Sequence, residues 1–549
     1  MAKEGSMEAQ QTEKKVFTTV SDIPVKRVYT PEDIADIQYE RDEGLPGEPP
    51  YVRGIYPHMY RERLWRIVQL SGSGTIEDTR KRIMRLVEAG ERGVTFEADR
   101  MICYSMLDAD DPDVVCRKDD VGHFGAPIQT LDDLRFMLEG IPIEKLHVRW
   151  GMFPMQITFE QACYFTIAQE RGIPLSEVEG QGHGCMFCAY ISNPTYKQIS
   201  PQVGNRFVCD CIEFSVRNNM MKWNPCTAAG HNARENGINA YQELAMVLSL
   251  QMLRADELLR RGLDIDDFAP KLAAVNFGVH DDFFEEIAKI RASRRMWYKL
   301  MKEKYNAKNP RSLALRIHGL TCSETFTYQQ PLTNIVRNTA RAIAGALAGV
   351  QGLGTASYDE AITVPTEEAA INSIRTQQIV QHELGITNTV DPLGGSYFVE
   401  WLTNEIEKRS WEYLQKIEDH GGFLACLKSG WFHAEAAKGM YEWERKIANG
   451  EWKWVGVNCY QMDEEALQVH AHPPNPKVWE EAKARLEKHR KNRDNQKVKE
   501  ALDELRSVAL SNENIMPAMM KAVKAGVTVG EVGNLWRELF GIWIAPLPL

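Results

Sequence analysis

Short hydrophobic runs alternate with longer amphipathic segments through the middle of the chain. Runs at 93–96, 146–150 and 227–229 have the length of buried strands. Helical periodicity marks 239–260 and 282–305. Strands separated by helices are typical of β–α units that build a parallel sheet. Because many such units follow one another, a (β/α)8 TIM barrel is predicted rather than an open sheet, with reacting groups at the carboxyl ends of its strands.

Further strands are expected at 271–275, 313–317 and 347–353, and the pattern changes after about residue 400. From there long charged helices dominate, including 478–504, which is typical of a solvated helical layer. The predicted organisation is an N-terminal arm at 1–40, a barrel at 41–400 and a C-terminal helical region at 401–549.

Composition narrows the class of protein. The 549 residues are 44% hydrophobic, enough for one large core, and carry a net charge of -11 with a pI near 5.7. This charge argues against nucleic acid or an anionic membrane as a partner. No run of about 18 apolar residues and no apolar signal core occur, so a cytoplasmic protein without a membrane segment is expected.

Two cysteine pairs lie close together in the chain with His183. Cys185 and Cys188 are followed about 20 residues later by Cys209 and Cys211, which is not a standard zinc spacing. Buried reduced thiols, one of them lining a pocket, are favoured over a metal or iron–sulfur site, and no metal ligand is assigned.

The stretch 351–366 is the strongest local candidate for chemistry. Between two helical patterns it places glycines, small residues and the carboxylate pair Asp359 and Glu360. Glycines let the backbone approach a ligand closely, so a strand end and a ligand-binding loop are predicted. An ordinary strand-to-helix connection is the alternative.

This stretch resembles the T-Q-S-L-H-T-N-x-x-D-E-A-x-x-x-P-T segment of the coenzyme B12-dependent acyl-CoA mutases. The resemblance extends over about residues 20–549 and implies a (β/α)8 barrel threaded by the pantetheine arm of coenzyme A, capped by a cobalamin-binding domain. The other matching segments are 53–65, 267–272, 284–295, 334–337 and 391–397.

The resemblance implies cofactor contacts at eight positions. Gln351 and Glu360 match residues that lie against the adenosyl group and the acyl substrate, and Ala356 replaces an asparagine there. The coenzyme A contacts would come from Tyr56, Met59, Arg63, Asn224 and Lys271.

In the same way the resemblance implies an acyl pocket. His318 matches a barrel-strand histidine near the migrating group. Leu70 stands at a family tyrosine and Asn193 at the arginine that pairs with a free carboxylate, so methylmalonyl-CoA is disfavoured. Asn232 falls at the histidine that bonds the thioester carbonyl, but a shift of one residue would place His231 there.

Glu97 indicates a hydroxyacyl substrate. The 2-hydroxyisobutyryl-CoA mutase branch has an aliphatic residue, an amide and an aspartate at the positions of Leu70, Asn193 and Glu97. The aspartate meets the substrate hydroxyl, so a 2-hydroxyisobutyryl-CoA or 3-hydroxybutyryl-CoA type of substrate is expected. His183 and Leu320 replace family glutamines, which leaves another branched or bulkier acyl group open. Alternatively, Glu97 pairs with Arg100 or another cation at the end of a strand.

The cobalamin-binding signature D-x-H-x-x-G does not occur, and Glu418–Gly422 has the wrong spacing. The resemblance therefore implies that adenosylcobalamin is bound mainly by a separate small subunit, with two large and two small subunits in a heterotetramer. The chain is expected to be the catalytic large subunit of an isomerase that performs a radical 1,2-rearrangement. A non-catalytic acyl-CoA-binding scaffold is the alternative from another class.

Overall fold

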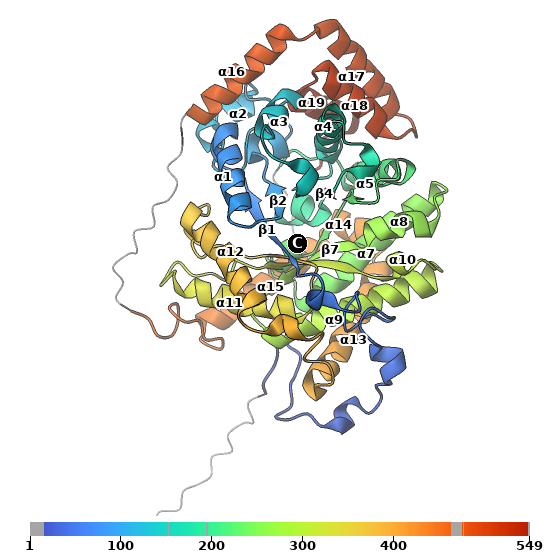
Figure 1. Cartoon of the computed structure of the whole chain (residues 1–549), viewed down its shortest axis with the longest axis vertical. Helices are drawn as coiled ribbons and strands as arrows, with labels where there is room; N and C mark the ends of the chain where they lie inside the picture. Colours follow the sequence, from blue (N-terminus) through green and yellow to red (C-terminus); the bar gives the residue numbers. More distant parts are fainter. Residues whose placement is uncertain (1–15, 152, 194–195, 463–474, 476, 547–549) are drawn as a thin grey trace, which may run out of the picture.

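The computed structural model describes residues 16–546, apart from 152, 194–195, 463–474 and 476. Within this part of the chain nine parallel strands form one sheet in the order β5-β4-β3-β2-β1-β9-β8-β7-β6, at the centre of Figure 1. The strands are β1 (Arg66–Ser71), β2 (Gly93–Phe96), β3 (His147–Trp150), β4 (Gly180–Gly182), β5 (Trp223–Asn224), β6 (Ala228–Ala229), β7 (Ala274–Val279), β8 (Arg316–Thr321) and β9 (Gly352–Gly354).

The sheet curls into a barrel because its two end strands are consecutive in the chain. Only residues 225–227 separate β5 from β6. Thr227 N donates to His183 O at 2.8 Å, which ties this segment to the end of β4. β5 and β6 therefore share one position of the wall, and the predicted (β/α)8 barrel is confirmed.

Helices cover the outside of the barrel (Figure 1). Successive strands start at one mouth and end at the other, so each crossover helix runs back along the outer wall. The helices used below are α4 (Ile157–Glu170), α6 (His231–Arg234), α7 (Ala240–Arg260), α8 (Ile265–Leu272), α9 (Phe283–Lys299), α11 (Thr333–Leu347), α13 (Tyr397–Asp419), α16 (Lys477–Asn492), α17 (Asn495–Ala509), α18 (Ile515–Ala525) and α19 (Val529–Phe540).

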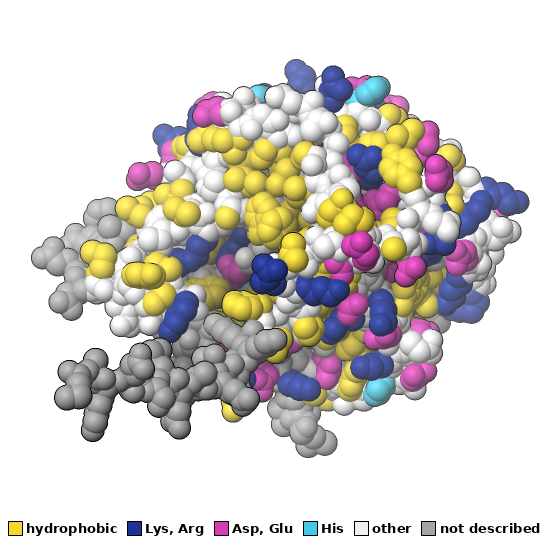
Figure 2. All heavy atoms as spheres, turned by 90° about the horizontal axis from the view of Figure 1, so that it is seen from below, with side chains coloured by type: hydrophobic (Ala, Val, Ile, Leu, Met, Phe, Trp, Pro, Cys, Tyr) yellow, Lys and Arg dark blue, Asp and Glu magenta, His cyan; other side chains and the backbone are white. Residues whose placement is uncertain are grey.

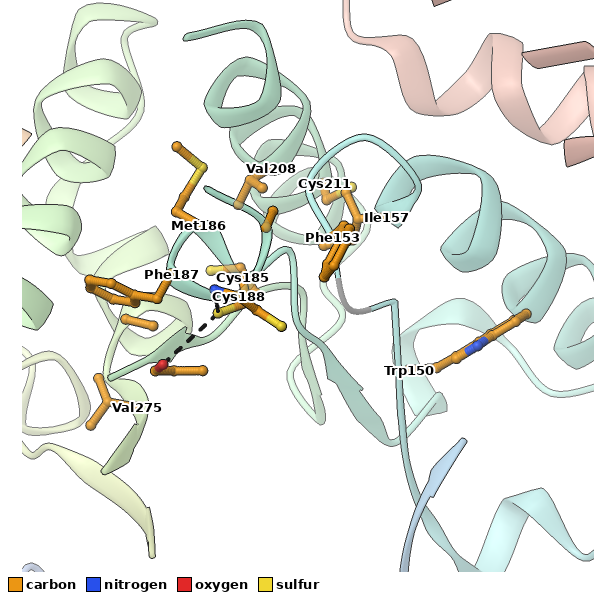
Figure 3. Close-up of a cluster of buried hydrophobic side chains, with 14 of the residues drawn as sticks. Trp150, Phe153, Ile157, Cys185, Met186, Phe187, Cys188, Val208, Cys211 and Val275 are labelled. Carbon is orange, nitrogen blue, oxygen red and sulfur yellow. Dashed lines mark hydrogen bonds between the residues drawn. The ribbon is translucent and has the colours of Figure 1, made fainter. Parts of the chain in front are cut away.

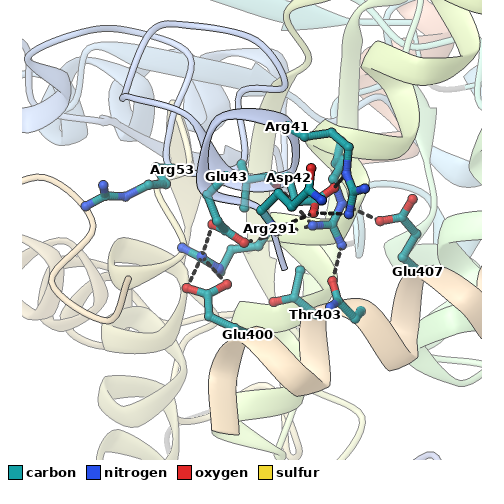
Figure 4. Close-up of polar contacts among 12 residues, drawn as sticks. Arg41, Asp42, Glu43, Arg53, Arg291, Glu400, Thr403 and Glu407 are labelled. Atoms are coloured by element: carbon teal, nitrogen blue, oxygen red, sulfur yellow. Dashed lines mark hydrogen bonds and ion pairs between the residues drawn. The ribbon is translucent and has the colours of Figure 1, made fainter. Parts of the chain in front are cut away.

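The segment 43–53, which follows the N-terminal arm, is anchored by a buried network of charged groups (Figure 4). The Arg291 guanidinium on α9 donates to Glu43 Oε2 at 2.9 Å and to Glu400 Oε1 at 2.7 Å, and also contacts Asp391. Asp391 accepts from Arg53 Nε at 2.9 Å. These bonds hold residues 43–53, and with them the segment that leads into β1, against α9 and α13.

The C-terminal helices pack on the barrel units. α13 lies against α7 and α9, and α18 lies against α4. The expected boundary between residues 400 and 401 falls inside α13, because the apolar face of that helix is continuous across it. The helix predicted at 478–504 is two helices, since Asp494 caps the start of α17.

The surface mixes charges of both signs. In Figure 2 dark-blue and magenta side chains are interspersed around a yellow hydrophobic area. No helix in the described part of the chain combines the length and hydropathy of a membrane span.

Candidate functional site

Two cavities open at opposite mouths of the barrel. The amino-end cavity, of about 920 Å³, is lined by residues at strand starts, such as Arg66, His147 and Arg316. The carboxyl-end cavity, of about 550 Å³, is lined by strand ends and the loops that follow them, such as Leu70, Glu97 and Thr321. The strands thus contribute side chains to both cavities.

The amino-end cavity is strongly cationic, although the chain as a whole is acidic. Eight lysines and arginines line it, against three carboxylates, Glu179, Asp266 and Asp267. Such an excess of donors suits a ligand with several phosphates. The cations are Arg63, Arg66, Arg92, Lys145, Lys222, Lys271, Arg311 and Arg316.

The structure places the five residues expected to contact coenzyme A together at this mouth: Tyr56, Met59, Arg63, Asn224 and Lys271. Met59 is buried, whereas Arg63 is exposed at the rim. The Asn224 amide oxygen accepts from Arg316 Nη2 at 3.1 Å. This placement brings the five together but does not test their roles.

The sequence predicted Lys271 on a strand, but it lies near the end of α8. The apolar positions Ile265, Phe268 and Leu272 follow a helical spacing, which extends that helix to the start of β7. Burial, with Arg316 and Arg311 nearby, lowers the pKa of Lys271 to about 7. Its Nζ donates to Trp223 O at 2.9 Å.

Gln351 is not placed beside Ala356 and Glu360. It precedes β9 and lines the amino-end cavity, whereas the other two follow β9 and line the carboxyl-end cavity. The Gln351 side chain bonds the backbone, accepting from Ile317 N at 2.8 Å and donating to Gly349 O at 2.9 Å. β9 thus separates Gln351 from the other two residues, and the contacts expected of all three with the adenosyl group and the acyl substrate stay predictions.

The carboxyl-end cavity brings together residues that lie far apart in the sequence. The loop after β9 lines it, as the pattern at 351–366 predicted. The predicted site residues in its lining are Leu70, Glu97, Asn193, His231, Asn232, His318, Ala356 and Glu360.

Glu97 follows β2 directly and is buried. The Tyr104 hydroxyl donates to Glu97 Oε2, and Oε1 has no partner. Glu97 forms no ion pair with any described cation, so the predicted alternative of an Arg100 partner is not observed. Burial raises the pKa of Glu97 to about 7, opposed by the Tyr104 hydrogen bond and by Arg100 and Arg149.

Three histidines, His183, His231 and His318, face the same cavity. Burial, followed by the charge of Arg149, lowers the pKa of each, to about 3 for His231. All three are therefore neutral near pH 7. His231 Nδ1 has no partner, whereas the Asn232 amide donates to Ala229 O at 3.4 Å. His231 is thus the freer of the two groups considered for the thioester carbonyl.

Arg149 on β3 lies inside the barrel between the two cavities. Its Nη1 donates to His318 Nε2 at 3.0 Å. With the Asn276 amide oriented to accept, Nη2 donates to its oxygen at 2.8 Å. Glycine at 352 leaves room for this arrangement, since a Cβ there would lie 2.7 Å from His318 Nδ1.

The two cysteine pairs are buried free thiols, as predicted (Figure 3). Cys188 lines the carboxyl-end cavity, and Cys185 Sγ accepts from Cys188 N at 3.2 Å. Among the described residues only Glu235, Cys322 and Glu324 come close enough to hold a metal ion, and that group includes neither pair.

Comparison with known proteins identifies relatives over almost the whole chain. The methylmalonyl-CoA mutase family matches residues 18–542. The 2-hydroxyisobutanoyl-CoA mutase large subunit of Aquincola tertiaricarbonis is 38% identical over 96% of this chain and 92% of its own length. The methylmalonyl-CoA mutase of Cereibacter sphaeroides is 34% identical over 98% of this chain and 74% of its own, and the human mitochondrial enzyme is 32% identical over 97% and 70%.

Proposed function

Because the chain belongs to the methylmalonyl-CoA mutase family and is therefore an acyl-CoA mutase, we propose that it is the catalytic large subunit of a two-subunit, adenosylcobalamin-dependent enzyme. Its substrate is a hydroxyacyl-CoA of the 2-hydroxyisobutyryl or 3-hydroxybutyryl type, and its reaction is a 1,2-rearrangement of the carbon skeleton. A small subunit binds most of the cobalamin.

The observation that carries this proposal is the cationic amino-end cavity, joined by the barrel wall to a small polar cavity. Arg66 and Leu70 on β1 belong to the two different cavities. They are four residue steps apart along the strand, a span of about 13 Å at ~3.3 Å per residue. A long ligand with phosphates at one end and a small reacting group at the other fits this division.

Acidic and amide groups at the carboxyl-end cavity fit the adenosyl group. Burial raises the pKa of Glu235 and Glu360, which lie in this lining with Asn232, and ribose hydroxyls could donate to their oxygens. Adenosylcobalamin, when bound, supplies the radical chemistry. The residues of this chain bind and orient the acyl group and exclude water from it.

Glu97 supports a hydroxyacyl substrate, because its unpartnered Oε1 can accept a hydrogen bond from a hydroxyl group. A non-catalytic acyl-CoA-binding scaffold would need the amino-end cavity but not this carboxylate. The presence of both the cationic amino-end cavity and the Glu97 carboxylate in one barrel favours a catalytic subunit over a scaffold.

The coenzyme A part of the proposal is tested at Arg63. We expect Arg63→Ala to raise the KM for acyl-CoA about tenfold and to leave kcat unchanged in the reconstituted enzyme. A phosphate contact far from the reacting atoms acts equally in the ground and transition states. A fall in kcat at constant KM would refute the assignment of Arg63 to coenzyme A.

A further inference from the structure

Arg149 is a buried cation without an anionic partner. Arg149 is only 5% exposed to solvent, and no described carboxylate forms an ion pair with it. Its two hydrogen bonds go to neutral groups, the His318 ring and the Asn276 amide. Nε has no partner. A charge held in this way is costly unless a ligand completes its hydrogen bonding.

The position of Arg149 relates it to both cavities. On β3 the side chains of His147 and Arg149 point to the same face, and His147 lines the amino-end cavity while Arg149 lines the carboxyl-end cavity. In the proposed mode of binding, a thioester that enters from the amino end passes Arg149 before its acyl group reaches Glu97.

Arg149 and Glu97 offer complementary groups to the same small space. Arg149 is a donor only, and the free Oε1 of Glu97 is an acceptor when ionised. A hydroxyacyl thioester has a carbonyl oxygen that accepts and, one or two carbons away, a hydroxyl that donates. This order of groups matches the order of the two side chains along the path.

Resting on the function proposed above, we propose that Arg149 binds the thioester carbonyl oxygen of the substrate, beside the His231 or Asn232 contact that the family resemblance implies, since this oxygen can accept two hydrogen bonds. Arg149 and Glu97 together would then select a hydroxyacyl-CoA. Arg149 is then a substrate-contacting residue, and His318 and Asn276 position its guanidinium. His318 accepts through Nε2, so its own proton is on Nδ1.

The test compares a hydroxyacyl-CoA with its thioether analogue, in which a CH2 group replaces the carbonyl. Dissociation constants are measured by calorimetry on the full chain, without turnover. We expect Arg149→Met to weaken binding of the thioester about tenfold to hundredfold and to change binding of the thioether less than threefold. Equal losses on both ligands would overturn the proposal, because Arg149 would then contact another part of the ligand.

Arg66→Met is the matched control. Arg66 also lies on the barrel lining but at the amino-end cavity, where it pairs with Glu179 at 2.9 Å. Its loss should weaken both ligands by the same factor. If wild-type protein bound neither coenzyme A nor acyl-CoA, the proposed function itself would fail, which is a different outcome from equal losses in Arg149→Met.

Two further measurements cover a variant that does not fold. Arg149→Lys keeps a charge and should show a smaller loss of the same selective kind. In wild-type protein, isotope-edited infrared spectra should show the thioester carbonyl stretch at lower wavenumber in the bound ligand than in water. A bound stretch at or above the value in water would overturn the proposal.

Discussion

Neighbouring strands place Glu97 and Arg149 on the wall of one cavity without joining them in an ion pair. Each tunes the other, since Arg149 lowers the pKa of Glu97 and Glu97 raises that of Arg149. Burial nevertheless raises the pKa of Glu97 to about 7. Its charge therefore changes within the range in which the enzyme can be assayed.

Glu97→Gln should lower kcat/KM for a hydroxyacyl-CoA about tenfold to hundredfold, since an ionised carboxylate is a stronger hydrogen-bond acceptor than an amide. The kcat/KM for the corresponding acyl-CoA without a hydroxyl should be nearly unchanged. In wild-type protein the ratio of kcat/KM for the hydroxyacyl-CoA to kcat/KM for the acyl-CoA without a hydroxyl should fall as the pH drops through about 7, because protonation removes the charge of Glu97. In the variant the ratio should not depend on pH. Steady-state kinetics on both substrates from pH 6 to 8.5 measure this.

Glu91→Gln provides a control for Glu97. Glu91 lies at the other end of β2, is also buried with a raised pKa, and lines neither cavity. Its substitution should leave the substrate ratio unchanged. If Glu97→Gln lowered kcat/KM equally for both substrates, Glu97 would have a structural role and would not recognise the hydroxyl group.

Lys271 should take up a proton when coenzyme A binds. Its pKa of about 7 leaves the amine mostly neutral at pH 8, and ligand phosphates nearby should raise that pKa. Calorimetry at pH 8 in two buffers with different ionisation enthalpies should show uptake of about half a proton or more, falling towards zero near pH 6.

Lys271→Met should abolish this uptake, whereas Lys222→Met should keep it. Lys222 lines the same cavity, but Glu177 raises its pKa, so it is protonated throughout this range. Uptake that persists without Lys271 would assign the proton to another group.

Most residues of the site could be predicted only because the sequence resembles the mutase family position by position. All eight residues expected at the acyl group or in the loop after β9, such as Leu70 and Asn193, line the carboxyl-end cavity. Arg149 was not identified, because in the run 146–150 it is one polar residue in an alternating strand. Only barrel closure brings it to His318, 169 residues later.

At the scale of elements, β3 and β6 were predicted to within one residue of their observed bounds, whereas the strands expected at 271–275, 313–317 and 347–353 share only two residues each with β7, β8 and β9, and β1 and β4 were not predicted. β2 was predicted with its observed ends. β1 presents Arg66 and Leu70 to the cavities, and β4 is Gly-Gln-Gly, which has no hydrophobic signal. A barrel with cavities at its centre weakens the pattern on which strand prediction depends.

The network around Arg291 should be the main anchor of the segment that leads into β1 at the amino-end cavity. Arg291→Met would leave Glu43, Asp391 and Glu400 without their shared cation, and we expect a loss of about 3–5 kcal/mol in the free energy of unfolding. Burial raises the pKa of Glu43, and Arg291 is the largest influence opposing it. The folded pKa of Glu43 is about 8 with Arg291 in place and should be higher without it, so the loss should be nearly constant from pH 5 to 7 and grow as the pH rises through about 8.

Urea titrations at several pH values measure this effect. Arg85→Met is the control, since Arg85 forms an exposed pair with Glu367 and should contribute less than about 1 kcal/mol. A loss in Arg291→Met no larger than in the control would show that packing, and not the charge network, holds residues 43–53 in place.

At the scale of the whole molecule, the two mouths of the barrel have different tasks. The amino-end cavity can take up the nucleotide end of a ligand from solvent. In the proposed reaction the carboxyl-end cavity must be covered, because radical chemistry requires that water be excluded from it. We expect a small cobalamin-binding subunit to provide that cover. The name of the 38% identical relative, a large subunit, implies that its own enzyme also has a smaller subunit.

The chain alone should therefore lose adenosylcobalamin on gel filtration and retain it when a cobalamin-binding small subunit is added. Addition of a hydroxyacyl-CoA to this complex should then produce a cob(II)alamin signal in electron paramagnetic resonance spectra, because substrate binding closes the site before the radical forms. Coenzyme A without an acyl group is the control and should give a weaker signal or none. Retention of cobalamin by the chain alone would contradict the two-subunit proposal. A complex that binds acyl-CoA but gives no signal with any acyl group would support the scaffold instead, because binding by itself needs only the amino-end cavity.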